Sequence, residues 1–256
     1  MKRPLVAMLM ISLAVPVASP AVGEGLSPAL HLAFDQGLFD EAATEARAIA
    51  SADAKAFAAR SLLAKAMCGD TQPDTATLEA AAALAEEAVV LDPIHVEGRL
   101  QLAIAKALIV RPLPGRRGMR DGRAARQLAE AVLETQPDNA YAHGFLAVWH
   151  IEVVGRGGRI GAAVMGASID QAHAHYARAA AILPGDASIH WQYARALATM
   201  NPKRFQAEIE VALAAARRSA PTSRVEQVMA DRAATLSELM ATGDRQVIVA
   251  AASEML

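Results

Sequence analysis

A proline spacing that recurs three times is the feature that most constrains the fold of this 256-residue chain. The prolines are Pro93, Pro137 and Pro184. A large apolar residue and an alanine follow each of them, nine and ten positions on: Leu102-Ala103, Leu146-Ala147 and Tyr193-Ala194. Proline disrupts a helix interior but is tolerated near helix ends. The spacing therefore predicts that one helix ends near each proline and that another, with a repeated packing pattern, begins just beyond it.

Small residues also recur at helical spacing before two of these prolines. Both sets lie at the same offsets, and spacings of four and three place each set on one helical face. The sets are Ala81, Ala85 and Ala88 before Pro93, and Ala172, Tyr176 and Ala179 before Pro184. Hydrophobic residues form 54% of the chain but aromatic residues only 4%, so the apolar content is chiefly alanine, leucine and valine. Since alanine is the strongest helix former and strand-like alternation is scarce, we predict an all-α fold.

This pattern resembles the tetratricopeptide repeat, in which a large residue and a small one on the first helix of a pair receive small residues from the second helix. The residues from Ala172 to Pro184 match it best, and a further unit fits around Gly37–Ala46. The resemblance implies a right-handed superhelical array of antiparallel helix pairs, an α-solenoid with a concave groove. We predict that the array spans residues 22–219, with helix pairs at 26–51, 56–92, 96–136, 140–183 and 187–219.

Residues 85–215 also resemble the repeat region of the regulator of microtubule dynamics family. The resemblance rests on Trp149-x-x-Glu152-Val153, a short apolar stretch over 162–168, and the repeat helix that begins near Ala172. In eukaryotic members this region is a tetratricopeptide-like domain associated with microtubules or organelle contact sites. An exported chain would not meet microtubules, so the resemblance implies the architecture and not the tubulin partner.

The prolines are 44 and 47 residues apart, more than the usual repeat of about 34 residues. Two Gly- and Pro-rich segments, 111–122 and 155–168, are therefore interpreted as inserts between the two helices of a pair, emerging on one face. They carry the candidate partner-binding residues Arg116, Arg117, Arg120, Arg156 and Arg159. Guanidinium groups bind carboxylates and phosphates well. The alternative is a solvated surface whose arginines pair with nearby Glu130, Glu134 and Glu152.

The N-terminus predicts export. Lys2 and Arg3 precede an apolar run from Leu5 to Val17, followed by small residues, which is the layout of a signal peptide. The run is shorter than the roughly 20 residues of a membrane-spanning helix. We predict a signal peptide over 1–21, cleavage before Val22, and a periplasmic or secreted bacterial protein. The alternative is an uncleaved anchor, through which alone the chain would contact a membrane.

Motifs for chemistry are scarce, and we predict no catalytic residue, no cofactor and no metal site. His173 and His175, two positions apart, point to nearly opposite faces of a helix and cannot hold one ion together. His143 and His190 both lie six residues after a proline, which favours a packing role. Cys68, the single cysteine, has no basic neighbour in sequence to lower its pKa and is expected to be a small buried residue.

Charge and the C-terminal segment complete the prediction. The net charge is −2, and it becomes −4 once Lys2 and Arg3 are removed, so nucleic acid is not expected as a partner. Residues 220–256 are expected to form a capping helix that ends at Gly243, then an apolar tail that either packs on the last repeat or binds a partner.

The predicted function is a non-enzymatic scaffold that binds a peptide, a protein or a small anionic ligand in its groove. The alternative is a structural cell-envelope subunit that bridges other proteins.

Overall fold

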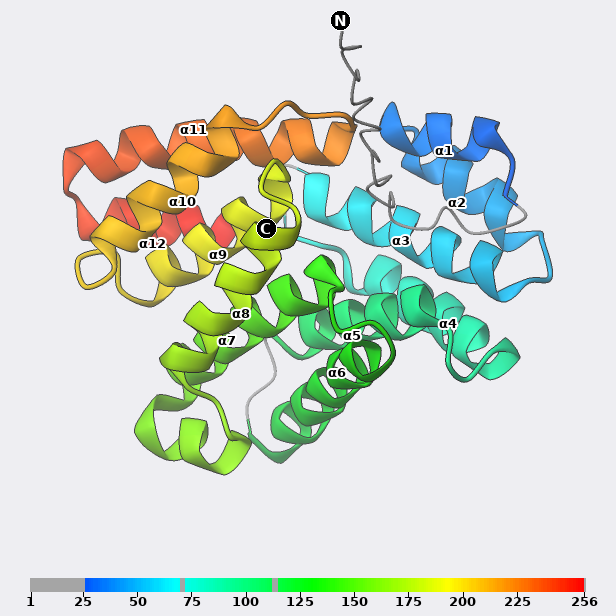
Figure 1. Cartoon of the computed structure of the whole chain (residues 1–256), viewed down its shortest axis with the longest axis horizontal. Helices are drawn as coiled ribbons and strands as arrows, with labels where there is room; N and C mark the ends of the chain where they lie inside the picture. Colours follow the sequence, from blue (N-terminus) through cyan, green and yellow to red (C-terminus); the bar gives the residue numbers. More distant parts are fainter. Residues whose placement is uncertain (1–25, 70–71, 112–114, 256) are drawn as a thin grey trace, which may run out of the picture.

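The computed structural model describes residues 26–69, 72–111 and 115–255, so the predicted signal peptide over 1–21 lies outside the described residues. Within these ranges the chain forms twelve helices and no strand, which confirms the all-α prediction (Figure 1). In chain order the helices are α1 (Pro28–Asp35), α2 (Phe39–Arg47), α3 (Ala52–Cys68), α4 (Thr75–Leu91), α5 (Val96–Val110), α6 (Gly115–Thr135), α7 (Ala140–Met165), α8 (Ile169–Ile182), α9 (Ala187–Met200), α10 (Gln206–Arg218), α11 (Arg224–Thr242) and α12 (Arg245–Glu254). No described helix combines the length and apolarity needed to cross a bilayer.

The predicted pairs correspond to α1–α2, α3–α4, α5–α6, α7–α8 and α9–α10, although α2 ends four residues early at Arg47 and α3 begins four residues early at Ala52. The residue two positions after each repeated proline caps the helix that begins at the following position. His95, Asn139 and Asp186 each accept a hydrogen bond from a backbone N–H of the first helical turn. Such side-chain caps satisfy donors that the helix itself leaves unpaired. The start of each of these helices is therefore determined by residues next to it in the sequence.

A second feature repeats six residues after each proline. Arg99 Nε donates to the Pro93 carbonyl at 2.9 Å. His143 Nε2 and His190 Nε2 lie 3.0 Å from the carbonyls of Pro137 and Pro184. Because a carbonyl only accepts, each histidine carries its proton on Nε2. This shared contact confirms that His143 and His190 occupy equivalent positions, and it gives both side chains a structural role.

The expected stripes of small residues lie in contact faces between helices. Ala81, Ala85 and Ala88 on α4, and Ala172 and Ala179 on α8, are fully buried. Tyr176 of α8 stacks on Tyr193 of α9, with ring centroids 3.7 Å apart. Ala181, off the stripe, is exposed. Small side chains allow the helix backbones to approach closely, which explains why alanine dominates this core.

The two predicted inserts are mostly helical, which corrects the expectation of Gly- and Pro-rich loops. α6 begins at Gly115, so Arg116, Arg117 and Arg120 lie on a helix. The second insert continues α7, which is interrupted at Gly158, where φ is +55° and ψ −160°. Tertiary contacts offset the low helix propensity of glycine: Trp149 Nε1, for example, donates to the Gly122 carbonyl at 2.8 Å.

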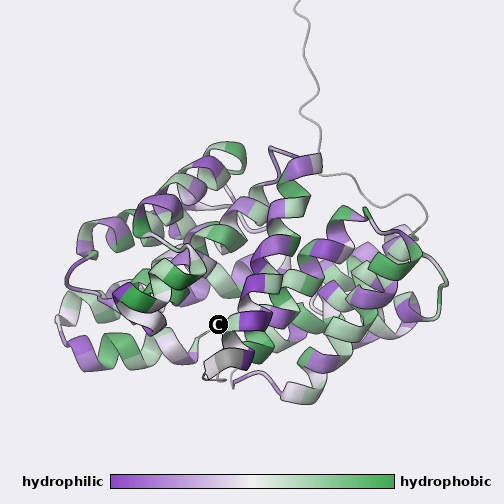
Figure 2. Ribbon diagram, turned by 90° about the horizontal axis from the view of Figure 1, so that it is seen from below, coloured by the Kyte–Doolittle hydropathy of each residue, from purple (hydrophilic) through white to green (hydrophobic). Residues whose placement is uncertain are grey.

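Each helix packs on the next, and the odd-numbered helices from α3 to α11 also pack on one another. The largest buried cluster surrounds α9 and includes Trp191, Leu197, Ile209, Leu213 and Leu236. Apolar and polar segments interleave along the same helices in Figure 2, as expected for helices with one buried face.

The predicted capping segment contains α11 and, where a tail was expected, the further helix α12. α12 packs on α9 and buries Ile248 and Ala252, so of the two alternatives for the tail the structure shows packing. α11 also returns to α3 and α1, and Figure 1 shows its end beside α1. Arg232 donates to the carbonyls of Met67 and Gly69 at 2.5 and 2.7 Å. We call this contact between the C-terminal helices and the α1–α3 region the closing contact.

Candidate functional site

A cavity of about 820 Å³ lies between the odd-numbered helices. Its walls come from α3, α5, α7, α9 and α11, with the first turns of α6. Most lining side chains are apolar, among them Leu63, Leu100, Ile104, Phe145, Val148 and Ile189. The volume falls in the range of roughly 300–1,000 Å³ that is typical of small-molecule pockets.

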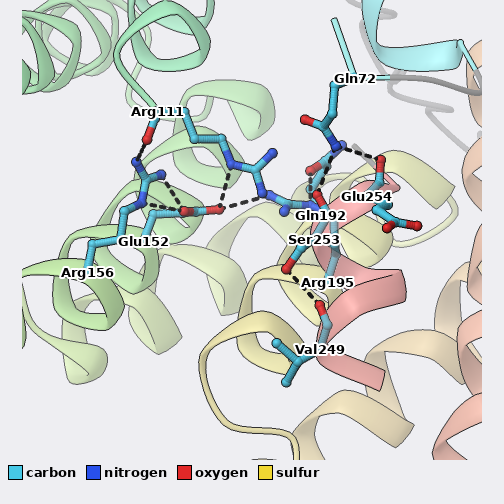
Figure 3. Close-up of polar contacts among 9 residues, drawn as sticks. All are labelled: Gln72, Arg111, Glu152, Arg156, Gln192, Arg195, Val249, Ser253 and Glu254. Carbon is cyan, nitrogen blue, oxygen red and sulfur yellow. Dashed lines mark hydrogen bonds and ion pairs between the residues drawn. The ribbon is translucent and has the colours of Figure 1, made fainter. Parts of the chain in front are cut away.

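Glu152 of α7 is the centre of a charged group in the cavity wall. Its carboxylate lies 3.2 Å from Arg195 Nη2 on α9, 2.5 Å from Arg156 Nη2 on α7, and 4.0 Å from Arg111 Nε at the end of α5 (Figure 3). We call Arg111, Glu152, Arg156 and Arg195 the arginine–glutamate cluster. Burial alone would raise the pKa of Glu152, but the charges of the three arginines outweigh it and lower the pKa to about 2. Glu152 is therefore ionised at neutral pH.

The arginine–glutamate cluster holds three guanidinium groups against one carboxylate. Arg195 is only 3% exposed, and its Nη1 has no hydrogen-bond partner among the described residues. Burial, then the charge of Arg195, lowers the pKa of Arg111 to about 10. A buried positive charge without a full counter-charge is costly, so this wall attracts an anion.

Two other polar groups line the same cavity. Arg60 of α3 lies over the rings of Phe34 and Phe57, 4.6 and 4.8 Å from their centroids, and 3.7 Å from Glu97. Elsewhere in the wall, Tyr141 donates to Asp186 at 2.7 Å. Burial, followed by the Asp186 charge, raises the pKa of the Tyr141 phenol far above its usual value. Tyr141 and Asp186 thus partner each other, whereas Arg60 Nε, like Arg195 Nη1, is buried without a hydrogen-bond partner among the described residues.

Glu226 of α11 lies in the same region of the wall as Asp186. Burial and the nearby Asp186 charge raise the pKa of Glu226, although hydrogen bonds from Thr222 act in the opposite direction. The cavity thus has an acidic region on α9 and α11 in addition to the basic region at the arginine–glutamate cluster.

Of the five candidate arginines, the structure places Arg156 in the cavity wall. Its Nη1 also donates to the Arg111 carbonyl at 2.7 Å, which ties the two insert regions together. Arg117, Arg120 and Arg159 are exposed, and the first two pair with Asp121. Arg116 lies on α6, but its side chain is outside the described part of the chain.

Sequence reasoning missed the role of Arg195. The signal was a single arginine inside the apolar stretch Tyr193–Ala198, one position after the repeated Tyr193-Ala194 pair. In the proposed alternative, acidic residues pair with the insert arginines. The structure shows Arg111 and Arg156 paired with Glu152, and Arg126, just beyond the first insert, paired with Glu130.

Histidines gather at the contact between α7 and α8. His143 Nδ1 lies 2.8 Å from His175 Nδ1, and His175 stacks on His150 at 5.8 Å. Since His143 carries its proton on Nε2, its Nδ1 accepts from the Nδ1–H of His175. Burial, and then the neighbouring His175, lowers the pKa of His150 to about 4. The backbone adds two contacts to this network, the Pro137 carbonyl at His143 Nε2 and the Ser168 N–H at His150 Nδ1. Within the described ranges no group of three or more His, Cys, Asp or Glu side chains could hold a metal ion.

Cys68 lies at the end of α3 and is half-buried, packed beside the main apolar cluster. Burial raises the pKa of its thiol, although Arg232 and Arg224 act in the opposite direction. A raised pKa disfavours the reactive thiolate.

Comparison with known proteins adds no family. The sequence matches no protein-family model, and no curated protein matches it significantly. The function is therefore argued from the cavity and its charges.

Proposed function

We propose that this chain is a non-catalytic binding protein built as a tetratricopeptide-like superhelical array, which holds its ligand in the central cavity. The observation that carries the proposal is the position of the cavity, enclosed by the odd-numbered helices and lined mainly by apolar side chains. The occupant is a segment of a peptide or protein partner, or a small ligand of matching chemistry. The equivalent caps and proline contacts of successive pairs support the repeat architecture.

A binding role suits the chemistry of the cavity better than catalysis. A general acid or base works best with a pKa near the working pH. The pKa of Glu152 is instead lowered to about 2 by the arginines around it. Its carboxylate thus organises positive charge and does not exchange protons at neutral pH.

Binding to the cavity is tested with N-phenyl-1-naphthylamine, a neutral fluorophore whose emission rises in apolar surroundings. We expect saturable binding to the purified protein. Ala107→Phe, which adds a ring to the α5 wall, should weaken it, because Ala107 lines the cavity. Ala181→Phe is the matched control on the exposed face of α8. Equal probe binding by the two variants contradicts a ligand site in the cavity.

The alternative, a structural cell-envelope subunit, makes a different prediction. A bridging subunit copurifies with other chains, whereas a ligand-binding protein purified alone retains a small molecule or peptide in its cavity. Native mass spectrometry of the purified protein separates the two by the mass of what remains bound.

Export forms part of the proposal and rests on the charged start and apolar run of the N-terminus. N-terminal sequencing of the extracellular or periplasmic form is expected to begin near Val22. Recovery of intact Met1 in washed membranes would support the uncleaved anchor instead.

A further inference from the structure

The charge of the arginine–glutamate cluster is the most unusual feature of the cavity. Its formal balance is three positive groups to one negative group. Among the described residues, the 4.0 Å contact with Glu152 is the only ion pair of the Arg111 guanidinium. The unpartnered Nη1 belongs to Arg195, a side chain more than nine-tenths buried. The wall thus contains guanidinium donors that a further oxyanion would satisfy.

Gln192 adds a neutral donor beside the same wall. Its Oε1 accepts from Arg195 Nε at 3.0 Å, which fixes the orientation of the amide. Within the part of the chain that the structure describes, its Nε2 has only the sulfur of Met229, 3.9 Å away, as an acceptor. Since sulfur is a weak acceptor, this N–H group is also available to a ligand oxygen.

The remainder of the cavity is apolar. Leu100, Ile104, Leu108, Val148 and Val153 line it on α5 and α7, the two helices that also carry Arg111 and Glu152. Each CH₂ group of a hydrocarbon chain that leaves water for this space strengthens binding. An apolar body and an anionic end can thus be bound by adjacent parts of one cavity.

We propose that the ligand is an amphipathic anion, an alkyl chain that ends in a carboxylate or phosphate. Its oxyanion pairs with Arg111 and Arg195, and its chain lies along the apolar walls of α5 and α7. This inference rests on the proposed function, because it names the ligand class of the same cavity.

An extended peptide fits these walls less well. Each residue of a peptide brings a backbone N–H and a C=O group, and a buried one without a partner is destabilising. The polar groups Tyr141, Asp186, Arg60 and Glu97 already bond to one another or pack on aromatic rings. An alkyl chain has a single polar end, which the guanidinium donors of the arginine–glutamate cluster can bind.

The proposal is tested by displacing N-phenyl-1-naphthylamine with dodecanoate, dodecyl phosphate and dodecan-1-ol, all below their micelle-forming concentrations. The three ligands share one chain and differ in the head group. We expect the better anion to bind at least about tenfold more tightly than the alcohol, as one charge-assisted hydrogen bond implies. Which of the two anions binds more tightly identifies the head group.

Arg111→Gln is the main variant, because the Arg111 side chain is partly exposed and its loss leaves two arginines beside Glu152. It should weaken binding of the anion about tenfold and leave dodecan-1-ol unchanged. Arg195→Gln should weaken binding of the anion by the same factor or more and also leave dodecan-1-ol binding unchanged. Arg178→Gln removes an exposed arginine that pairs with Asp138 on the surface, and it is the matched control. It should change neither anion binding nor dodecan-1-ol binding. Circular dichroism checks that each variant folds.

The outcomes separate the two proposals. If the neutral probe binds but the anions bind no better than the alcohol, the ligand class is wrong and the cavity site stands. If the anions prefer the wild-type protein and Arg111→Gln does not reduce that preference, the arginine–glutamate cluster is not the anion site. If neither the probe nor any ligand binds, both proposals fail.

Discussion

Two neighbouring helices of equal length, α8 and α9, differ sharply in burial. Ten of the fourteen residues of α9 are buried, but only Ala172 and Ala179 of the fourteen in α8. α9 packs on α7, α10, α11 and α12, whereas α8 packs mainly on α7. Both helices are rich in alanine. Position in the array, more than local sequence, therefore decides how much of a helix is core.

The difference in burial between α8 and α9 also indicates which arginine belongs to the candidate site. A helix buried on nearly all sides admits a charged residue only where another charge compensates it, and Arg195 of α9 meets Glu152 of α7. Arg178 on α8 pairs with Asp138 at the surface, where solvent screens the charges. The comparison predicts that changes in α9 affect both stability and binding, and that changes on the outer face of α8 affect neither.

The largest expected effect is on the core of α9. Trp191→Ala removes a fully buried indole and should lower the free energy of unfolding by about 3–5 kcal/mol. Tyr176→Ala on α8 removes a half-buried ring and should lower it by clearly less. Urea denaturation followed by circular dichroism measures both, and equal losses would remove the distinction between the helices.

Acid should loosen the contact between α7 and α8. The pKa of His150 is lowered from 6.5 to about 4 in the folded state by burial and by the neighbouring His175. Because the folded state favours the neutral ring, this stability is present above pH 6.5 and is lost as the pH falls towards 4. The loss should reach about 3 kcal/mol, at about 1.4 kcal/mol per pKa unit.

Unfolding free energies measured from pH 7 to pH 4 test this. His150→Gln should flatten that part of the profile, because Gln does not titrate. A variant with the same slope as the wild-type protein would assign the acid sensitivity to other groups.

The two faces of α8 offer a smaller effect. Ala179 is fully buried where α8 meets its neighbours, so Ala179→Leu should overpack the contact and cost roughly 1–3 kcal/mol. Ala181 is exposed, and Ala181→Leu should be nearly neutral. Similar melting temperatures for both variants would show that the repeat register is wrong.

The smallest effect is expected for the exposed arginines of the former inserts. Changing Arg117, Arg120 and Arg159 together to Ser should leave the unfolding free energy nearly unaltered, because solvent screens exposed charges. Dodecanoate binding should also be unchanged. If a protein partner is found, weaker binding by this variant with a flatter salt dependence would give these residues the role expected from the sequence.

The sequence allowed the helices to be predicted, because their boundaries depend on local signals. The caps at His95, Asn139 and Asp186 follow each proline by two residues, and the contacts of His143 and His190 repeat with the same spacing. Local rules failed for Gly115–Gly122, where glycine content predicted a loop. The indole of Trp149, 27 residues further on, bonds the Gly122 carbonyl of that helix.

The candidate site was only partly predictable for the same reason. Arg156 was identified because it lies in a visible charge run, and its partner Glu152 is four residues away on the same helix. Arg195 is 43 residues from Glu152, and Arg111 is 41. Only folding brings these three together, and no spacing rule within one helix pair connects them.

The closing contact has a consequence for how the chain unfolds. In an open array, a terminal unit has one neighbour and can fray while the rest persists. Here α11 contacts α1 and α3, and Gln72 Nε2 donates to the carbonyls of Ser253 and Glu254 at 3.2 and 3.1 Å. Each end therefore supports the other, and loss of either exposes both. Amide hydrogens in the first and last helices should exchange together, in one cooperative opening rather than two independent ones.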